Sequence, residues 1–287
     1  MNVMSDTPIK RSAQSLELMA YELRCNVVTL VAGTGQGYVQ QGLGAADLFA
    51  ALYGRELNYR KDEPNWPDRD RFLLSTAHNS AIFGAALAQA GLLPSDVLTT
   101  YCQDGSPYEI NMSERLGPIV EATCGSLGQG LSVAVGMALS GKRKKSSYRC
   151  YVMLGDGELQ EGQVWEATMA AGHYGLDNLC MIIDWNQMQV EGDTELVMNM
   201  EPVADKFIAF NWNVLKIDGH DIDEIVDAFD KARLFRGQPT VIIARTLVGK
   251  GVPSLEGILG HNLKLPPDMA DKALRELHES KPAVREN

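Results

Sequence analysis

Residues 150–174 read CYVMLGDGELQEGQVWEATMAAGHY. The first five form an apolar run that predicts a buried strand, and residues 160–174 have helical periodicity. The glycines on either side of Asp156 allow the sharp turn between them. A tight turn without a function is the alternative for the Gly-Asp-Gly triplet taken alone. In an open α/β sheet, however, this strand, turn and helix place Asp156 where ligands bind, beyond the carboxyl end of a strand.

The rest of the chain repeats the alternation of apolar strands and helices. Residues 33–44 are glycine-rich and predict a loop outside the core. Continuous apolar strands separated by helices predict an α/β, doubly wound fold with a mainly parallel sheet and helices on both faces. We expect one domain over residues 1–287, with an N-terminal helical extension and a C-terminal helical tail. The expected strands are 72–75, 179–184, 214–217 and 240–244, and the expected helices are 15–30, 45–53, 77–90, 127–139, 222–234 and 268–279.

The charge of the chain excludes some classes of partner. Its 287 residues include 26 Lys and Arg against 37 Asp and Glu, a formal net charge of −11. This balance offers no general attraction for nucleic acid or an anionic membrane, so local features have to hold an anionic ligand. The first 14 residues lack the apolar core of a signal peptide, and no apolar run reaches about 20 residues, so we expect a cytoplasmic protein. The five cysteines lack CxxC spacing and are expected to be reduced.

A second polar segment, DWNQM at residues 184–188, follows another apolar run. A doubly wound sheet can bring the ends of these two strands together. The Asp156 carboxylate, the Asn186 side-chain carbonyl and the Met188 backbone carbonyl are then hard oxygen ligands. Such ligands suit Mg²⁺, or Ca²⁺ in its place, and the cation would neutralise a phosphate ligand.

The strongest sequence signal is a pair of segments, GDGELQEGQVWEA at 155–167 and DWNQMQVEG at 184–192. Four further segments are GLGAADLFAALY, DRFLLSTAH, CGSLGQGLSVAVGMAL and ARTLVGKGVPSLEG. All six resemble segments of the transketolase family and follow the family's order across nearly the whole chain. The resemblance implies the diphosphate-binding (PP) type of domain, with thiamine diphosphate and Mg²⁺ as cofactors. It also implies transfer of a two-carbon ketol unit from a ketose donor to an aldose acceptor.

The same resemblance implies roles for individual residues. His78 and His261 match histidines near the diphosphate and the substrate, where an imidazole assists proton transfer. Glu161 and Glu166 match acids at the subunit contact that couple paired active sites. From these matches we expect His78, His261 and Glu161 to be catalytic. The alternative for the two glutamates is solvated acids near a helix N-terminus. The residues expected to face the cofactor are Gly125, Ser126, Leu127, Gly155, Asp156, Gly157, Glu158, Asn186 and Lys250.

Two family histidines have no counterpart here. Ungapped alignment of the first glycine-rich segment puts Tyr38 in one histidine position, with Gln36 as the nearby alternative. Met112 occupies the other histidine position. These histidines contact the donor sugar in the family, so we expect Tyr38, Gln36 and Met112 near the substrate and a non-standard ketose donor. Misalignment of flexible glycine loops is the alternative.

The segments that resemble the family do not include its pyrimidine-binding domain. In the family, that domain supplies the glutamate that activates the cofactor. We therefore expect a separate C-terminal transketolase subunit as partner, in a dimer of two-chain units acting on sugars or sugar phosphates. Two other functions stay open. One is a subunit of a thiamine-dependent 2-oxoacid decarboxylase or dehydrogenase, which shares the metal motif, and the other is a noncatalytic structural subunit. His173, His220 and His278 fit no motif.

Overall fold

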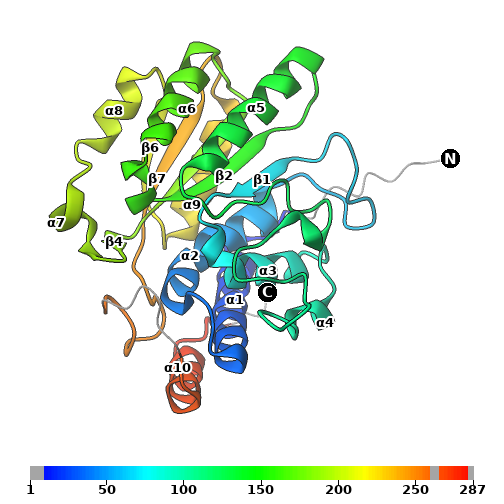
Figure 1. The fold of residues 1–287 in the computed structure, drawn as a ribbon, viewed down its shortest axis with the longest axis vertical. Coiled ribbons are helices and arrows are strands. Elements are labelled where there is room, and N and C mark those ends of the chain that lie inside the picture. Colours follow the sequence, from blue (N-terminus) through cyan, green and yellow to red (C-terminus); the bar gives the residue numbers. More distant parts are fainter. Residues whose placement is uncertain (1–9, 259–264, 284–287) are drawn as a thin grey trace.

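The computed structural model describes residues 10–258 and 265–283, and a five-stranded sheet forms its centre (Figure 1). Every pair of neighbouring strands in this sheet is parallel. The strand order is β1-β2-β3-β7-β6, so the first three strands are neighbours in sequence and the last two are added in reverse. The strands are β1 Arg71–Leu74, β2 Cys150–Gly155, β3 Leu179–Trp185, β6 Asn213–Asp218 and β7 Thr240–Arg245.

Both faces of the sheet are buried under helices. Successive strand residues point to opposite faces, so Tyr151 and Met153 of β2 join one apolar cluster, whereas Val152 and Leu154 join another. Helices α1, α2, α3 and α9 contribute to the first cluster, and α5, α6 and α8 contribute to the second. This arrangement confirms the doubly wound fold. These helices are α1 Ala13–Thr34, α2 Val39–Ala51, α3 Ser80–Gln89, α5 Gln129–Lys144, α6 Gly162–His173, α8 Val203–Ala209 and α9 Ile222–Leu234.

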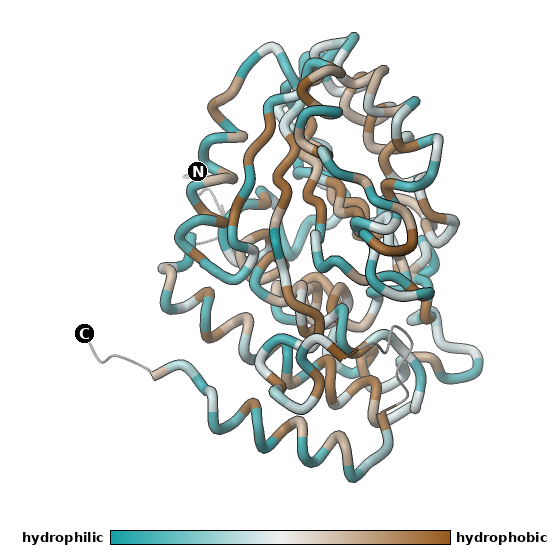
Figure 2. Tube along the Cα trace, turned by 90° about the vertical axis from the view of Figure 1, so that its left-hand side faces the viewer, coloured by the Kyte–Doolittle hydropathy of each residue, from teal (hydrophilic) through white to brown (hydrophobic). Residues whose placement is uncertain are grey.

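The C-terminal helix α10, Pro267–Glu279, is amphipathic and packs along α1. Figure 2 shows polar and apolar residues alternating along the helix that leads to the C-terminus. Its apolar side, with Ala270, Ala273 and Leu277, is buried in the first cluster. None of the helices in the described ranges is long and apolar enough to cross a membrane. The smaller elements are α4 Ser95–Leu98, α7 Thr194–Met198, a hairpin of β4 Met188–Gln189 and β5 Gly192–Asp193, a π-helix at Leu52–Glu56, and 3₁₀ helices at Ala77–Asn79, Glu114–Leu116 and Gly157–Gln160.

The prediction that residues 33–44 form a loop outside the core is wrong for most of this segment. Gly33 lies within α1, α2 begins at Val39, and every residue of α2 is buried. A Cβ atom on Gly42 would lie 3.0 Å from the Val27 side chain of α1. One on Gly44 would lie 2.9 Å from the Leu247 carbonyl oxygen. These two glycines therefore permit close packing of a buried helix, and only residues 35–38 connect α1 to α2.

Candidate cofactor and metal site

The candidate site lies where the parallel strands end along one edge of the sheet. Gly155 at the end of β2 pairs with Asp184 of β3, and Asp184 pairs with Ala244 of β7. The backbone N–H of Asp156 donates to the Asp184 carbonyl at 3.3 Å. The segments after β2 and β3 are therefore adjacent, as the sequence predicted, and Asp156 and Asn186 each follow their strand within two residues.

Asp156 is a buried carboxylate held by backbone donors. Its side chain accepts hydrogen bonds from the N–H of Gly157 at 2.7 Å and from that of Gln187 at 2.6 Å. Burial, reinforced by the nearby Asp184 carboxylate, raises the pKa of Asp156 to about 7. A cation at this position would favour the ionised form, because it offsets both causes of the shift.

The turn at residues 186–188 faces Asp156. Gln187 adopts a left-handed backbone conformation with φ of 62°, and the Asn186 side-chain oxygen accepts from the Met188 N–H at 3.0 Å. The Asn186 amide group donates to Asp184 at 3.2 Å, which orients its oxygen. That oxygen keeps a second lone pair for a ligand.

This donor set fits a magnesium ion. It offers the Asp156 carboxylate and the Asn186 amide oxygen, and the expected third ligand, the Met188 carbonyl, belongs to the same 186–188 turn. All three are hard oxygen donors. Across residues 10–258 and 265–283, no group of three or more His, Cys, Asp or Glu side chains could hold a metal ion. A cation here would therefore need amide, carbonyl, phosphate and water oxygens beside one carboxylate, as magnesium accepts.

Glu158 is also buried, with 2% of its surface exposed, but the protein's own groups bind its carboxylate. It accepts from the Ser75 hydroxyl, from the Gly128 N–H at 2.6 Å and from the Gly155 N–H at 3.3 Å. Burial raises the pKa of Glu158 to about 7. These contacts tie the ends of β1 and β2 to the start of α5, so Glu158 organises the loops around the site.

The segment 125–128 leads into α5 and lies against the start of α6. Gly125 and Gly128 have φ of 151° and 87°, conformations that favour glycine. The Gln163 side chain donates to the Leu127 carbonyl at 2.9 Å, and a Cβ atom on Gly128 would lie 2.9 Å from the Cβ of Glu161. The structure thus places Leu127 and Gly128 beside Gln163 and Glu161, which come from a separate sequence motif.

His78 lies in the 3₁₀ turn after β1, and its ring stands against that of Tyr38. The two ring centroids are 4.6 Å apart, and the ring planes are inclined by 51°. Met112 is different, because it is 2% exposed and packs into the first apolar cluster. In this arrangement the Met112 side chain is covered by the core and does not contact a ligand outside it.

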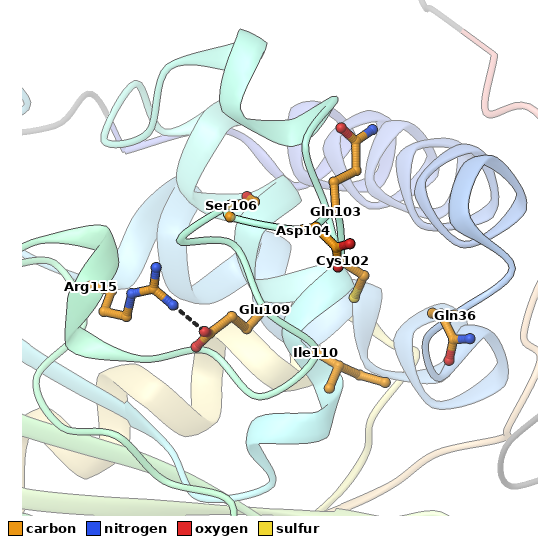
Figure 3. A pocket seen from close by; sticks show the side chains of 9 residues that line it. Gln36, Cys102, Gln103, Asp104, Ser106, Glu109, Ile110 and Arg115 are labelled. Carbon is orange, nitrogen blue, oxygen red and sulfur yellow. Dashed lines mark hydrogen bonds and ion pairs between the residues drawn. The ribbon is translucent and has the colours of Figure 1, made fainter.

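Gln36 lines an open cavity of about 340 Å³ between the α1–α2 connection and residues 102–115 (Figure 3). Glu109 and Arg115 form an ion pair across from Gln36. The wall also includes Cys102 and Ile110. Gln36 and Tyr38 are thus close in sequence, but Gln36 lines this cavity whereas Tyr38 packs on His78.

The loop after β7 carries Lys250, which is half-buried. His261 lies outside the described residues.

Sequence reasoning assigned no role to three polar residues at this sheet edge, Asp184, Thr246 and His220. Asp184 accepts a hydrogen bond from the Thr246 hydroxyl, and His220 contacts the backbone of the same loop. The usable signal was position, because each of the three stands at or just after the carboxyl end of a parallel strand.

Comparison with known proteins identifies the family of this chain. A family model described as "Transketolase, thiamine diphosphate binding domain" matches residues 16–269. A putative uncharacterized transketolase family protein of Sinorhizobium fredii is 46% identical over 91% of this chain and 94% of its own length. The 6-deoxy-6-sulfo-D-fructose transketolase subunit of a Clostridium species is 42% identical over 85% of this chain and 90% of its own length.

Solved structures give the same result. The transketolase from Campylobacter jejuni superposes with a TM-score of 0.88 at 33% identity. The match covers 93% of this chain but 43% of the Campylobacter chain, so this protein spans less than half of that enzyme. With the buried Asp156, the adjoining 186–188 turn and the family match over most of its length, this chain belongs to the transketolase family and corresponds to its thiamine diphosphate binding domain.

Proposed function

We propose that this chain is the N-terminal, diphosphate-binding subunit of a thiamine-diphosphate-dependent transketolase. The complete enzyme would transfer a two-carbon ketol unit from a ketose donor to an aldose acceptor. The observation that carries the proposal is the contact between Asp156 and the 186–188 turn, since its oxygen donors suit a magnesium diphosphate. When bound, thiamine diphosphate supplies the electron sink for cleavage of a carbon–carbon bond.

At the metal site, the residues of this chain anchor the cofactor and do not contact the bond that reacts. Asp156, Asn186 and the Met188 carbonyl hold Mg²⁺, while the backbone at Gly155 and Gly157 approaches the diphosphate. Ca²⁺ would fit the same oxygen donors with a looser geometry. Lys250 adds a positive charge from the loop after β7, and residues 125–127 face the aminopyrimidine.

Proton transfers near the reacting carbon fall to histidine. His78 follows β1 at the same sheet edge and is oriented by its ring contact with Tyr38. His261 has the same proposed role. Glu161 extends from the start of α6 beside Gly128 and contributes at the subunit contact.

Tyr38 and Met112 replace hydrogen-bonding imidazoles, so the preferred donor is a non-standard ketose. Recognition of an ordinary ketose phosphate would lose the polar contacts of those imidazoles. The Tyr38 phenol, whose ring lies against His78, offers a different polar contact. A relative named for 6-deoxy-6-sulfo-D-fructose supports the idea that close members of this family act on unusual sugars. Gln36 is the second residue of this chain proposed to meet the substrate.

A separate C-terminal subunit would supply the pyrimidine-binding domain. The Clostridium relative is named as a subunit and has a length similar to this chain, which supports a split enzyme. We propose a dimer of two-chain units, a heterotetramer, in the cytoplasm. One domain over residues 1–287 stays a prediction.

The test mixes this chain with a candidate partner that carries a pyrimidine-binding domain, thiamine diphosphate and Mg²⁺. Ketose donors are screened with aldehyde acceptors, and new ketoses are detected by mass spectrometry. Two-carbon transfer that needs both chains supports the proposal. Release of carbon dioxide from 2-oxoacids would favour the decarboxylase alternative, and turnover by the partner alone would favour a noncatalytic subunit.

A further inference from the structure

His220 follows β6 at the sheet edge that holds the proposed site, and its imidazole connects two parts of the molecule. Its Nδ1 lies 2.8 Å from the Asp47 carboxylate of α2. Its Nε2 accepts a hydrogen bond of 2.8 Å from the backbone N–H of Leu247, just after β7. The side chain is only 14% exposed. Two polar contacts on opposite sides of one nearly buried ring fix its orientation.

Asp47 determines which ring nitrogen of His220 carries the proton. The guanidinium of Arg24 on α1 binds the same carboxylate oxygen of Asp47. Burial opposes ionisation, but Arg24 and His220 together hold the pKa of Asp47 below its ordinary value. An ionised carboxylate only accepts hydrogen bonds, so Nδ1 of His220 is the donor. Nε2 is then left with the lone pair that receives the Leu247 N–H.

Leu247 lies in the loop after β7 that carries Lys250, and α2 contacts the other side of this loop. The Gly249 N–H donates to the Gln40 carbonyl of α2 at 2.8 Å, and the Lys250 N–H donates to the Leu247 carbonyl at 3.3 Å. Gly44 of α2 lets the Leu247 carbonyl approach closely, because a Cβ there would lie 2.9 Å from that oxygen. The path of residues 247–251 therefore depends on contacts from α2 and from His220.

We infer that His220 is a positioning residue. Arg24 and Asp47 orient its ring, and the ring holds Leu247 so that the following turn presents Lys250 to the diphosphate. The part that concerns the cofactor rests on the function proposed above. The part that concerns the loop does not, because every contact in it is between residues of this chain.

The loop is tested first, without cofactor, by hydrogen exchange and mass spectrometry on the full-length chain. His220→Leu removes both polar contacts, whereas His220→Gln keeps one donor and one acceptor. We expect His220→Leu to speed exchange in peptides covering residues 247–251 by about tenfold, as for one lost buried hydrogen bond, with β2 and β3 peptides unchanged. His220→Gln should reverse most of the increase. Unchanged exchange at 247–251, or an equal increase through β2 and β3, would overturn the inference.

The cofactor is tested second, by calorimetric titration of thiamine diphosphate in the presence of Mg²⁺. We expect His220→Leu to weaken binding by about five- to tenfold. His220→Gln and the exposed control His173→Leu should stay within about twofold of the unmodified chain. Equal affinity in His220→Leu would overturn the link to the cofactor. If the unmodified chain binds no cofactor with or without its partner, the proposed function fails, and the exchange experiment alone decides the role of His220.

Discussion

Tyr38 and His78 lie ring against ring, with centroids 4.6 Å apart. We expect Tyr38→Phe to keep this packing but to lower kcat/KM for the preferred donor by about 5- to 100-fold, because a substrate hydroxyl loses its partner. Tyr38→His should raise kcat/KM for an ordinary ketose phosphate. Steady-state kinetics with the partner subunit measure both effects. A Tyr38→Phe variant that loses cofactor affinity and not donor selectivity would contradict this role.

Glu158 links the stability of the ligand-free chain to pH. Burial raises its pKa to about 7, so the folded state binds this proton more tightly than the unfolded state. The resulting stabilisation is present at low pH and is lost as pH rises from about 4.3 toward the folded pKa. We expect the unfolding free energy to fall by roughly 2–3 kcal/mol more between pH 5 and 8 than it does in Glu158→Gln. Urea titrations of both proteins check this, and equal pH dependence would rule it out.

Gly130 and Gly136 of α5 form a matched pair. A Cβ atom on Gly130 would lie 2.6 Å from the Ser75 side chain, whereas nothing lies within 4 Å at Gly136. We expect Gly130→Ala to destabilise the chain by about 1–3 kcal/mol through overpacking. Gly136→Ala should stabilise it by about 0.5–1 kcal/mol, because alanine favours a helix. Urea unfolding measures the free energy of unfolding of both variants. An increase in both would contradict the prediction, because it would mean that α5 can move away from Ser75 without loss of stability.

The exposed face of α6 should contribute to assembly. Met169 is 55% exposed beside the exposed Glu166, and Tyr174, which follows the helix, is 50% exposed. We expect Met169→Glu to shift the complex with the partner toward smaller species, because it places a charge in an apolar contact. Sedimentation velocity measures the change. Leu234→Glu, on the exposed end of α9, should have no effect, and the same shift in both variants would point to general destabilisation.

Much of the fold followed from the sequence because its strands are continuous apolar runs. Such runs identify buried parallel strands, so β2 and β3 were predicted within a residue or two of their ends. The same reasoning placed Asp156 and Asn186 at adjacent strand ends. Helix α2 was missed at its start because a glycine-rich sequence usually indicates a loop, whereas Gly42 and Gly44 here serve close packing.

The remaining parts of the site depend on contacts between distant segments. Nothing local to His220 indicates that its ring joins Asp47 to Leu247, because these residues come from three separate elements. Glu158 was expected to face the cofactor, and only the fold reveals that Ser75 and Gly128 donate to its carboxylate. The roles of individual site residues stay predictions, and His261 lies outside the described residues.

The most direct test of the central claim is calorimetric titration of thiamine diphosphate into this chain with its candidate partner, with and without Mg²⁺. We predict binding that requires Mg²⁺, is lost in Asp156→Asn and is kept in Asp227→Asn, which changes an exposed carboxylate on α9. Circular dichroism confirms that both variants are folded. Binding that does not need Mg²⁺, or that survives Asp156→Asn, would contradict the assignment of this strand end as the diphosphate site.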